Sequence, residues 1–360
     1  MIKKIDTILI VSLILALIIF FATSLGVNMN NNLKERKDLE TLKIAVIFTG
    51  SGLGDKSFND LIYDGLLKAQ KELGIEFDYV EPIYPEEYEK SLMEFAETEE
   101  YQLIIAIGPE QENDVKAVSE RFPNQKFTLI DSKLEANNVS SIYTRWEEQA
   151  FLNGVISGIL SKKEYEVSGF MPKAGIILGM EVPHLREGAI GFEAGFKYVN
   201  PEGEVMSAVV NDFKNPLKAR ETALLMYSKG VKYIQHLAGA SGLGVFSAAK
   251  ESGGYAFGVD ENQNFFEPNV IISTATRYMN QIIFNEIKYV KDNSWNDGVH
   301  LSGLKEGIID ITREGSQVEL DPYVMKTVKK IKSKIVNDEL TIPKSKEELD
   351  DWVKVNKYKD

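Results

Sequence analysis

The side chains that most often carry out chemistry in proteins are sparse in this sequence. It contains three histidines, His184, His236 and His300, and no cysteine. The lack of cysteine excludes disulfides, zinc–thiolate sites, iron–sulfur clusters and thiol nucleophiles. The histidines share no H-E-x-x-H or similar metal-binding spacing, and we expect His300 to lie in a loop. The sequence therefore predicts no metal site, no resident cofactor and no catalytic constellation.

Two glycine-rich segments follow apolar runs and precede helical patterns. The first, GSGLGDKS at 50–57, nearly matches the phosphate-binding loop G-x-x-x-x-G-K-[ST], but Asp55 stands where that loop requires glycine. A carboxylate there would repel phosphate, so we expect a turn in which Asp55 or Ser57 caps the next helix. The second, GASGLG at 239–244, lacks the dinucleotide-binding spacing G-x-G-x-x-G. Its glycines allow close approach of a ligand, which makes Gly239 a candidate contact.

Short apolar runs alternate with helical patterns from residue 42 onward, and the alternation restarts near residue 174. Such alternation predicts parallel strands with crossover helices, and two such units predict two lobes with a cleft between them. In open α/β sheets, ligands bind beyond the carboxyl ends of the strands. We therefore expect a single site lined by the loops 49–58, 108–111, 131–133, 180–184, 237–243 and 260–265.

The same pattern suggests where the two lobes begin and end. We assign residues 42–146 plus about 277–300 to an N-terminal lobe. Residues 147–273 plus about 301–345 form a C-terminal lobe, and 346–360 form a tail.

An apolar N-terminal segment precedes this acidic α/β region. Lys3 and Lys4 come before an apolar run from Ile8 to Ala22, so residues 1–27 read as a transmembrane helix or a secretory signal. We expect an uncleaved anchor, followed by a polar tether at 28–41, that leaves the body outside the cytoplasm. Cleavage after Ser24, giving a secreted form, is the alternative. The net charge of −13 argues against nucleic-acid binding, which needs a basic surface.

The stretch GDKSFNDLIYDGL at 54–66 resembles the signature of the basic membrane protein family. These proteins are substrate-binding components of ABC importers and include bacterial purine-nucleoside receptors. Further similar segments are RFPNQKFTLID at 121–131, GFEAGFKYVNP at 191–201, AGASGLGV at 238–245 and FGVDENQ at 257–263. The resemblance covers about 42–343. It implies the type I periplasmic-binding fold, in which two Rossmann-like lobes are joined by a three-stranded hinge, and a function that is not enzymatic.

The resemblance also implies which residues bind a ligand. In the family, the Phe of DKSFN stacks on the purine and the next Asn bonds the base; these are Phe58 and Asn59 here, although Phe58 could instead be a core residue that opens a helix. The Asp of the GVD motif, Asp260, holds ribose hydroxyls, and Asp131 ends an earlier strand at a matching position. Arg277 replaces a family lysine that contacts the sugar. We expect Arg277 to pair with Asp260 in the empty cleft, because buried charges need partners.

Three positions depart from the nucleoside receptors. Thr49 replaces an Asp that reads the purine edge, and Gln235 replaces a second stacking Phe. Pro109 and Glu110 stand where small and aromatic residues are usual. Loss of a stacking face and of a carboxylate acceptor predicts weaker or altered base selectivity, with ribose recognition better preserved.

By resemblance, then, the chain is an extracytoplasmic solute-binding protein that delivers a nucleoside-like ligand to ABC permease and ATPase subunits. Some relatives are instead membrane-associated regulators, similar to Med-type activators of competence genes in bacilli. A chain without the cysteine that carries lipid in family lipoproteins suits that role too. A nucleoside-processing enzyme is the third reading.

Overall fold

A computed structural model of the chain describes residues 41–169 and 171–359. The predicted membrane or signal segment at 1–27, and the tether at 28–41 except Thr41, lie outside the described residues. Within the described ranges, no helix combines the length and apolar character needed to cross a membrane. Residues Lys43–Asp360 form one compact unit.

The N-terminal lobe is built on a six-stranded sheet in the order β11-β5-β4-β3-β1-β2. All its neighbouring strands are parallel. The central strands are continuous apolar runs, as expected for strands buried on both faces. The strands are β1 (Lys43–Ile47), β2 (Glu76–Val80), β3 (Leu103–Ile107), β4 (Phe127–Ile130), β5 (Val139–Thr144) and β11 (Gly298–Ser302). The helices are α2 (Phe58–Leu73), α3 (Glu87–Glu97), α4 (Glu112–Arg121) and α10 (Met279–Lys291), with a 3₁₀ turn η1 (Pro109–Gln111).

The C-terminal lobe repeats this plan with the order β12-β10-β9-β8-β6-β7, in which β12 is antiparallel to β10. Its strands are β6 (Lys173–Leu178), β7 (Glu204–Val209), β8 (Tyr233–Leu237), β9 (Tyr255–Asp260), β10 (Ile271–Arg277) and β12 (Ile309–Thr312). The helices are α6 (Phe151–Ser168), α7 (Pro183–Val199), α8 (Pro216–Ser228), α9 (Leu243–Ser252), α11 (Pro322–Val336) and α12 (Lys346–Val355). The short helix α5 (Trp146–Gln149) and the 3₁₀ turns η2 (Gly239–Gly242) and η3 (Gln263–Phe265) complete the described elements.

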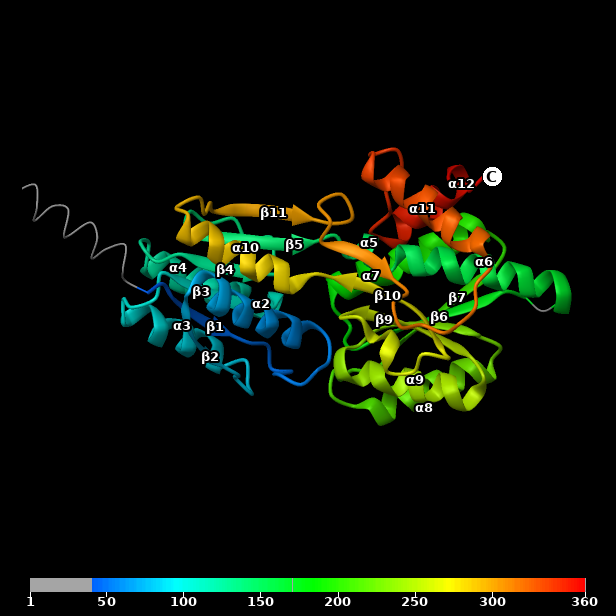
Figure 1. Cartoon of the computed structure of the whole chain (residues 1–360), viewed down its shortest axis with the longest axis horizontal. Coiled ribbons are helices and arrows are strands. Elements are labelled where there is room, and N and C mark those ends of the chain that lie inside the picture. The colour runs from blue at the N-terminus through cyan, green and yellow to red at the C-terminus, as the bar shows by residue number, and fades with distance from the viewer. Residues whose placement is uncertain (1–40, 170, 360) are drawn as a thin grey trace, which may run out of the picture. The chain divides into compact units, whose positions relative to one another are not determined.

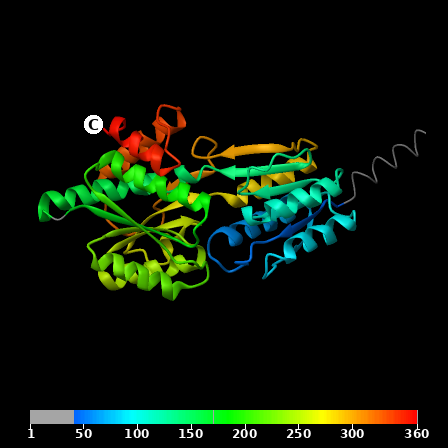
Figure 2. The ribbon, with the colours of Figure 1, turned by 180° about the vertical axis from the view of Figure 1, so that it is seen from behind.

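The chain passes between the lobes three times, and Figures 1 and 2 show the two sheets as separate blocks. The crossings follow β5, follow β10, and lie between β11 and β12. Two separate sheets confirm the prediction of a two-lobe α/β fold, since one continuous sheet would have contradicted it.

Two details differ from the sequence-based expectations. His300 lies in the edge strand β11 and not in a loop. The segment 346–360, which we assigned as a tail, includes α12, and α12 packs on α7 (Figure 1). There Leu349 is fully buried, and Trp352 makes ring contacts with Phe151 and Tyr198. The last helix is therefore part of the C-terminal core.

Glycines bring α6 and α7 unusually close together in that core. A Cβ added at Gly195 of α7 would lie 2.0 Å from the carbonyl oxygen of Phe151, and one at Gly154 of α6 would lie 2.1 Å from that of Phe192. Such distances are far below van der Waals contact. Helices α5 and α6 directly follow the first passage of the chain between the lobes, after β5. The close contact between α6 and α7 therefore fixes where the C-terminal lobe begins.

Candidate functional site

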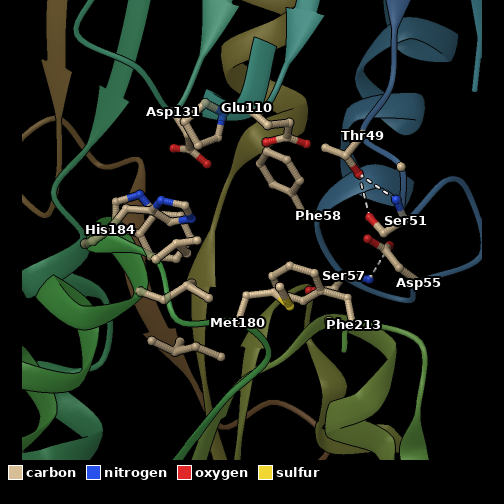
Figure 3. A pocket seen from close by; sticks show the side chains of 18 of the residues that line it. Thr49, Ser51, Asp55, Ser57, Phe58, Glu110, Asp131, Met180, His184 and Phe213 are labelled. Atoms are coloured by element: carbon tan, nitrogen blue, oxygen red, sulfur yellow. Dashed lines mark hydrogen bonds between the residues drawn. The ribbon is translucent and has the colours of Figure 1, made fainter. Parts of the chain in front are cut away.

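A cavity of about 790 Å³ opens between the carboxyl ends of the strands of both lobes (Figure 3). All six loop regions predicted from the strand ends contribute to its wall, together with Arg277 from the end of β10. Its volume lies in the range typical of small-molecule sites. The predicted residues that line it are Thr49, Phe58, Asp131, Gly239, Asp260 and Arg277.

Arg277 is the central charge of this site. Its side chain is only 1% exposed, and its guanidinium ion-pairs with Asp131 (Nη1–Oδ2, 2.9 Å) and with Asp260 (Nε–Oδ1, 3.0 Å). Nη1 also donates to Thr144 Oγ1 at 3.0 Å. The pKa of Arg277 is raised: burial alone would lower it, but the two carboxylates outweigh that effect. The expected pair between Asp260 and Arg277 is present, and Asp131 is a second partner.

The two aspartates occupy equivalent places in the two lobes. Asp131 directly follows β4 and Asp260 ends β9, and each of these strands is third in its sheet order. Both residues have φ of 61°, in the left-handed region that aspartate tolerates better than most residues. This shared turn aims one carboxylate from each lobe at the same guanidinium, so Arg277 joins the two lobes.

Asp260 uses both of its oxygens within the protein. Oδ1 accepts hydrogen bonds from Arg277 and from Gln149 Nε2 at 2.7 Å, and Oδ2 accepts from Ser57 Oγ at 2.7 Å. Ser57 belongs to the N-terminal lobe, so this last bond crosses the cleft. In this arrangement Asp260 fastens the lobes together, and a sugar hydroxyl would have to share or replace one of these donors.

Aromatic rings enclose the guanidinium and form an apolar wall. The guanidinium carbon of Arg277 lies 4.0 Å from the ring centre of Trp146 and 4.8 Å from that of Phe58. Phe58 is half-buried and lines the cavity, so it is not the core residue that the alternative reading allowed. Such cation–π stacking stabilises the buried charge and holds both rings in place.

The loop before α2 is held by a network in which Asn59 is central. Asn59 is fully buried and its Nδ2 donates to Thr49 Oγ1 at 3.0 Å, Ser51 Oγ at 2.8 Å and the Gly52 carbonyl at 2.9 Å. Asn59 does not line the cavity. The position of Asn59 therefore does not support the predicted direct bond to a ligand base, because the Asn59 amide forms hydrogen bonds within the loop.

Asp55 caps α2, as one of the two alternatives for this turn predicted. Its carboxylate accepts the backbone N–H groups of Ser57, Asn59 and Asp60 at 2.9–3.2 Å, whereas Ser57 makes no side-chain cap. Burial raises the pKa of Asp55 to about 6, against the lowering effect of these N–H groups. Asp55 and Thr49 line the cavity but already have partners (Figure 3).

Gln235 is also directed away from the cavity. It is fully buried in β8, where Oε1 accepts from Asn153 Nδ2 at 2.8 Å and Nε2 donates to the carbonyls of His236 and Gly258. Gln235 does not line the cavity, so its position does not support the predicted ligand contact. The ring of Phe213, from the loop between β7 and α8, lines the cavity instead.

Glu110 reaches the cavity from the turn η1, and Figure 3 shows its carboxyl beside the ring of Phe58. Tyr88 Oη accepts the Gly50 N–H at 2.9 Å and shares a hydrogen bond with the Glu110 carboxyl. The Glu110 side chain is exposed within the cavity, and the surrounding walls only partly desolvate its carboxyl. That desolvation, with a smaller contribution from Asp131, raises the pKa of Glu110 to about 7.

The histidines do not form a reactive centre. His236 is fully buried in the core, and burial lowers its pKa to about 4. His184 lines the cavity beside Trp146, 4.8 Å between ring centres, and burial lowers its pKa as well. Over residues 41–169 and 171–359, no group of three or more His, Cys, Asp or Glu side chains is arranged to hold a metal ion.

Trp146 and Tyr88 are among the site residues that the strand-end reasoning missed, as are Phe213 and Tyr143. Trp146 lies two residues after β5 at the first crossing, and Tyr88 lies in the first turn of α3. Trp146 is one of only three tryptophans in the chain, and its place next to a predicted lobe boundary was a usable signal. Tyr88 had none, because its side chain reads as an ordinary core residue of an amphipathic helix.

Two α/β lobes with a ligand-sized cavity between them are the architecture of two-lobe binding proteins. Residues 41–346 match the family described as "ABC transporter substrate-binding protein PnrA-like", and the chain belongs to this Bmp family. Basic membrane protein A of Borreliella afzelii is 32% identical over 324 residues, covering 87% of this chain and 94% of that protein. A lipoprotein of Pyrococcus abyssi is 28% identical over 364 residues, covering 89% of each.

Solved structures agree with this assignment. A solute-binding protein of an ABC transporter system from Aeropyrum pernix matches with a TM-score of 0.77 and 26% identity, over 88% of this chain and 98% of that one. A transcriptional activator of the comK gene from Bacillus halodurans shares the fold, with a TM-score of 0.70 and 17% identity over 83% of this chain and 99% of that one. The family and its structural neighbours of the transporter class are solute-binding proteins and not enzymes.

Proposed function

We propose that the protein is the extracytoplasmic receptor of an ABC importer and that it binds a nucleoside or a close analogue in the cavity between its lobes. The observation that carries this proposal is the Arg277 centre, in which one buried guanidinium joins a carboxylate from each lobe and an aromatic ring from the N-terminal lobe. A nucleoside has a flat ring and a vicinal diol. Phe58 offers a stacking surface for the ring, and the charged groups around Arg277 can exchange hydrogen bonds with hydroxyls.

Family membership supports the same reading, since the matching description names ABC transporter substrate-binding proteins. The site still contains polar groups and aromatic rings, although Thr49 and Gln235 differ from the residues expected by resemblance to nucleoside receptors. Glu110, Trp146 and Phe213 line the cavity as well. We therefore expect altered base selectivity and not a loss of binding.

A ligand panel tests the proposal directly. Purified full-length protein in detergent is screened by thermal shift against purine and pyrimidine nucleosides, free bases and free sugars. A ligand present at 100 times its Kd stabilises the folded state by about 2.7 kcal/mol. We expect at least one nucleoside to raise Tm while ribose and the free base alone do so weakly or not at all. No shift with any nucleoside would contradict the proposed ligand class.

A pair of variants then places the ligand in the cavity. Phe58→Leu removes the stacking ring and should weaken affinity for the stabilising nucleoside by about 10- to 100-fold, the usual worth of one stacked base. Phe284→Leu is the matched control. Phe284 is half-buried on α10, outside the cavity, where Lys68 lies over its ring. Equal affinity in both variants would place the ligand elsewhere.

The importer role needs a cellular test. We expect deletion of the gene to abolish uptake of the radiolabelled nucleoside that stabilises the purified protein, and genes for a permease and an ATPase to lie beside it. We also propose that residues 1–27 remain attached as a membrane anchor with the body outside the cytoplasm. An intact mass that begins at Leu25 would show cleavage after Ser24 instead.

A membrane-bound regulator of the Med type is the second candidate, and one observation favours it. The Pyrococcus abyssi relative is named a lipoprotein, whereas this chain has no cysteine to carry a lipid. Normal nucleoside uptake in the deletion strain, together with changed transcription of a defined set of genes, would favour this role over transport.

A further inference from the structure

We propose that Glu110 selects the ligand, by accepting hydrogen bonds from N–H groups on the edge of the ring that stacks on Phe58. The preferred ligand is then a heterocycle with two adjacent N–H donors, such as the amino-oxo edge of guanosine, and not one with a lone donor or with acceptors only. This inference rests on the proposed function, because it assumes a nucleoside-like ligand in the cavity.

The first argument is the state of the other carboxylates in the wall. Asp55 accepts three backbone N–H groups of α2, and Asp131 and Asp260 are both paired with Arg277. Glu187 and Glu112 accept hydroxyls of Tyr143 and Ser132, at 2.5 Å each. In the described part of the chain, no basic side chain lies within ion-pair distance of Glu110. Glu110 is therefore a carboxylate without an ion pair that keeps open acceptor positions beside Phe58 (Figure 3).

The second argument is the place of the carboxyl relative to the ring. In Figure 3 the Glu110 carboxyl lies beside Phe58, and both side chains face the cavity. A flat ligand stacked on Phe58 would direct an edge, and not a face, toward such a group. A carboxylate has about four acceptor positions. The backbone N–H of Glu110 itself uses one of them and Tyr88 uses another, which leaves two positions for a pair of neighbouring N–H groups.

The third argument is that the protein holds Glu110 rigidly. Gly108 has φ of 102°, a backbone conformation that residues other than glycine rarely adopt, and Pro109 follows it. Gln111, on the other side, is fully buried and donates through Nε2 to the carbonyls of Ile47 and Ile107 at 3.1 and 2.7 Å. The turn η1 is therefore fixed at both ends. A recognition group that is already in place loses little entropy when the ligand binds.

This reading also gives a role to one of the departures from the nucleoside receptors. Thr49 stands where those receptors carry the Asp that reads the purine edge, and its hydroxyl is engaged by Asn59. Glu110 supplies a carboxylate to the same cavity from a different strand end.

Guanosine and inosine form the test pair, because they differ only in the 2-amino group. Calorimetry on the full-length protein in detergent should give guanosine about a tenfold advantage over inosine, the usual effect of one additional hydrogen bond to a charged group. In Glu110→Gln, one acceptor oxygen becomes a donor, and the advantage should fall below about twofold. Glu120→Gln on the exposed face of α4 is the matched control and should keep the wild-type ratio.

The possible results separate the two proposals. If guanosine and inosine both bind with similar affinity and Glu110→Gln leaves their ratio unchanged, the role of Glu110 is wrong and the nucleoside receptor stands. If neither guanosine nor inosine binds the wild type but another nucleoside does, the role of Glu110 is wrong and the nucleoside receptor stands; if no nucleoside binds, both proposals fail. Thermal unfolding within about 2 °C of wild type shows that a changed ratio does not come from misfolding, and Glu110→Ala must reproduce the loss of preference.

Discussion

Arg277 combines two properties that rarely occur together, full burial and contact with two carboxylates from different lobes. Removing one partner of a buried ion pair leaves uncompensated charge in a medium of low dielectric constant. Here the substitution of one residue would leave two carboxylates unpaired. The residue is therefore important for the fold as well as for any ligand.

We predict that Arg277→Met lowers the free energy of unfolding by about 3–5 kcal/mol, the usual cost of breaking a buried pair. Arg277→Lys should also destabilise the folded state, because a single ammonium group cannot bond both carboxylates at once as the planar guanidinium does. Urea unfolding followed by circular dichroism measures both effects. The control is Arg186→Met, which breaks an exposed pair with Glu181 and should cost no more than about 1 kcal/mol. Similar losses for Arg186→Met and Arg277→Met would contradict this account.

At the scale of elements, the first crossing depends on a carboxyl that is partly neutral. Glu148 of α5 is 9% exposed, accepts the Leu304 N–H at 2.7 Å, and faces Arg145, Glu147 and Glu306. Burial, opposed by that N–H bond and by Arg145, raises the pKa of Glu148 to about 7. The folded state therefore favours the protonated form, whereas the unfolded chain titrates near its ordinary value of about 4.5.

The sign of the pH effect follows from that raised pKa. The stabilising contribution is complete below about pH 4.5 and is lost as the pH rises to about 7, with an upper limit of roughly 3 kcal/mol. In Glu148→Gln the amide oxygen still accepts the Leu304 N–H but does not titrate. We expect the variant to gain stability relative to wild type between pH 5 and pH 8, as measured by urea midpoints. Parallel pH profiles for the two proteins would show that Glu148 does not titrate in this range.

The contact between α6 and α7 gives a second prediction at this scale. Gly195→Ala would place a methyl group 2.0 Å from the Phe151 carbonyl oxygen, so the helices must move apart. The gain in helix propensity of about 1 kcal/mol does not offset overpacking, and we expect a net loss of about 1–3 kcal/mol in the free energy of unfolding. Lys162→Ala, an exposed position on α6, should change stability by less than about 0.5 kcal/mol. A Gly195→Ala variant as stable as wild type would mean that this contact is loose.

The elements differ in how well the sequence predicts them. Strand β3 (LIIAI) is apolar throughout because both of its faces are buried, and such a run predicts a strand of a parallel sheet. Strands β11 and β12 were missed, since edge strands with half-exposed residues such as His300 carry no apolar run. Their partners β5 and β10 lie far away in the sequence, so no local pattern predicts these strand pairs.

The same limit applies to the site. Strand ends predict which loops meet, so the loops carrying Asp131 and Asp260 were located correctly. Residue type does not tell in which direction a side chain points, and so Asn59 and Gln235 could not be distinguished from cavity residues. Only the three-dimensional arrangement shows that their amides bond to the protein.

At the scale of the whole molecule, hydrogen bonds beside the cavity connect the lobes directly, and one of them runs from Tyr143 Oη to Glu187 Oε2 at 2.5 Å. Ser57 Oγ donates to Asp260 Oδ2 at 2.7 Å, and Gln263 Nε2 donates to the Lys56 carbonyl at 3.0 Å. Both join the start of α2 to the loop after β9. Together with the bridge from Arg277 to Asp131, they hold the lobes in contact before any ligand is present.

We predict that Ser57→Ala shifts the ligand-free protein toward a more open arrangement of the lobes. A hydrogen bond to a charged group is worth about 1.5–3 kcal/mol, which is enough to change a two-state population by tenfold or more. Small-angle X-ray scattering should show a larger radius of gyration for Ser57→Ala without ligand, and a saturating nucleoside should restore the wild-type value. Ser51→Ala is the matched control, because Ser51 bonds only to Thr49 and Asn59 within its own lobe. If the Ser57→Ala and Ser51→Ala scattering curves coincide, the bond between Ser57 and Asp260 does not govern closure, and the remaining contacts between the lobes are enough to hold them together.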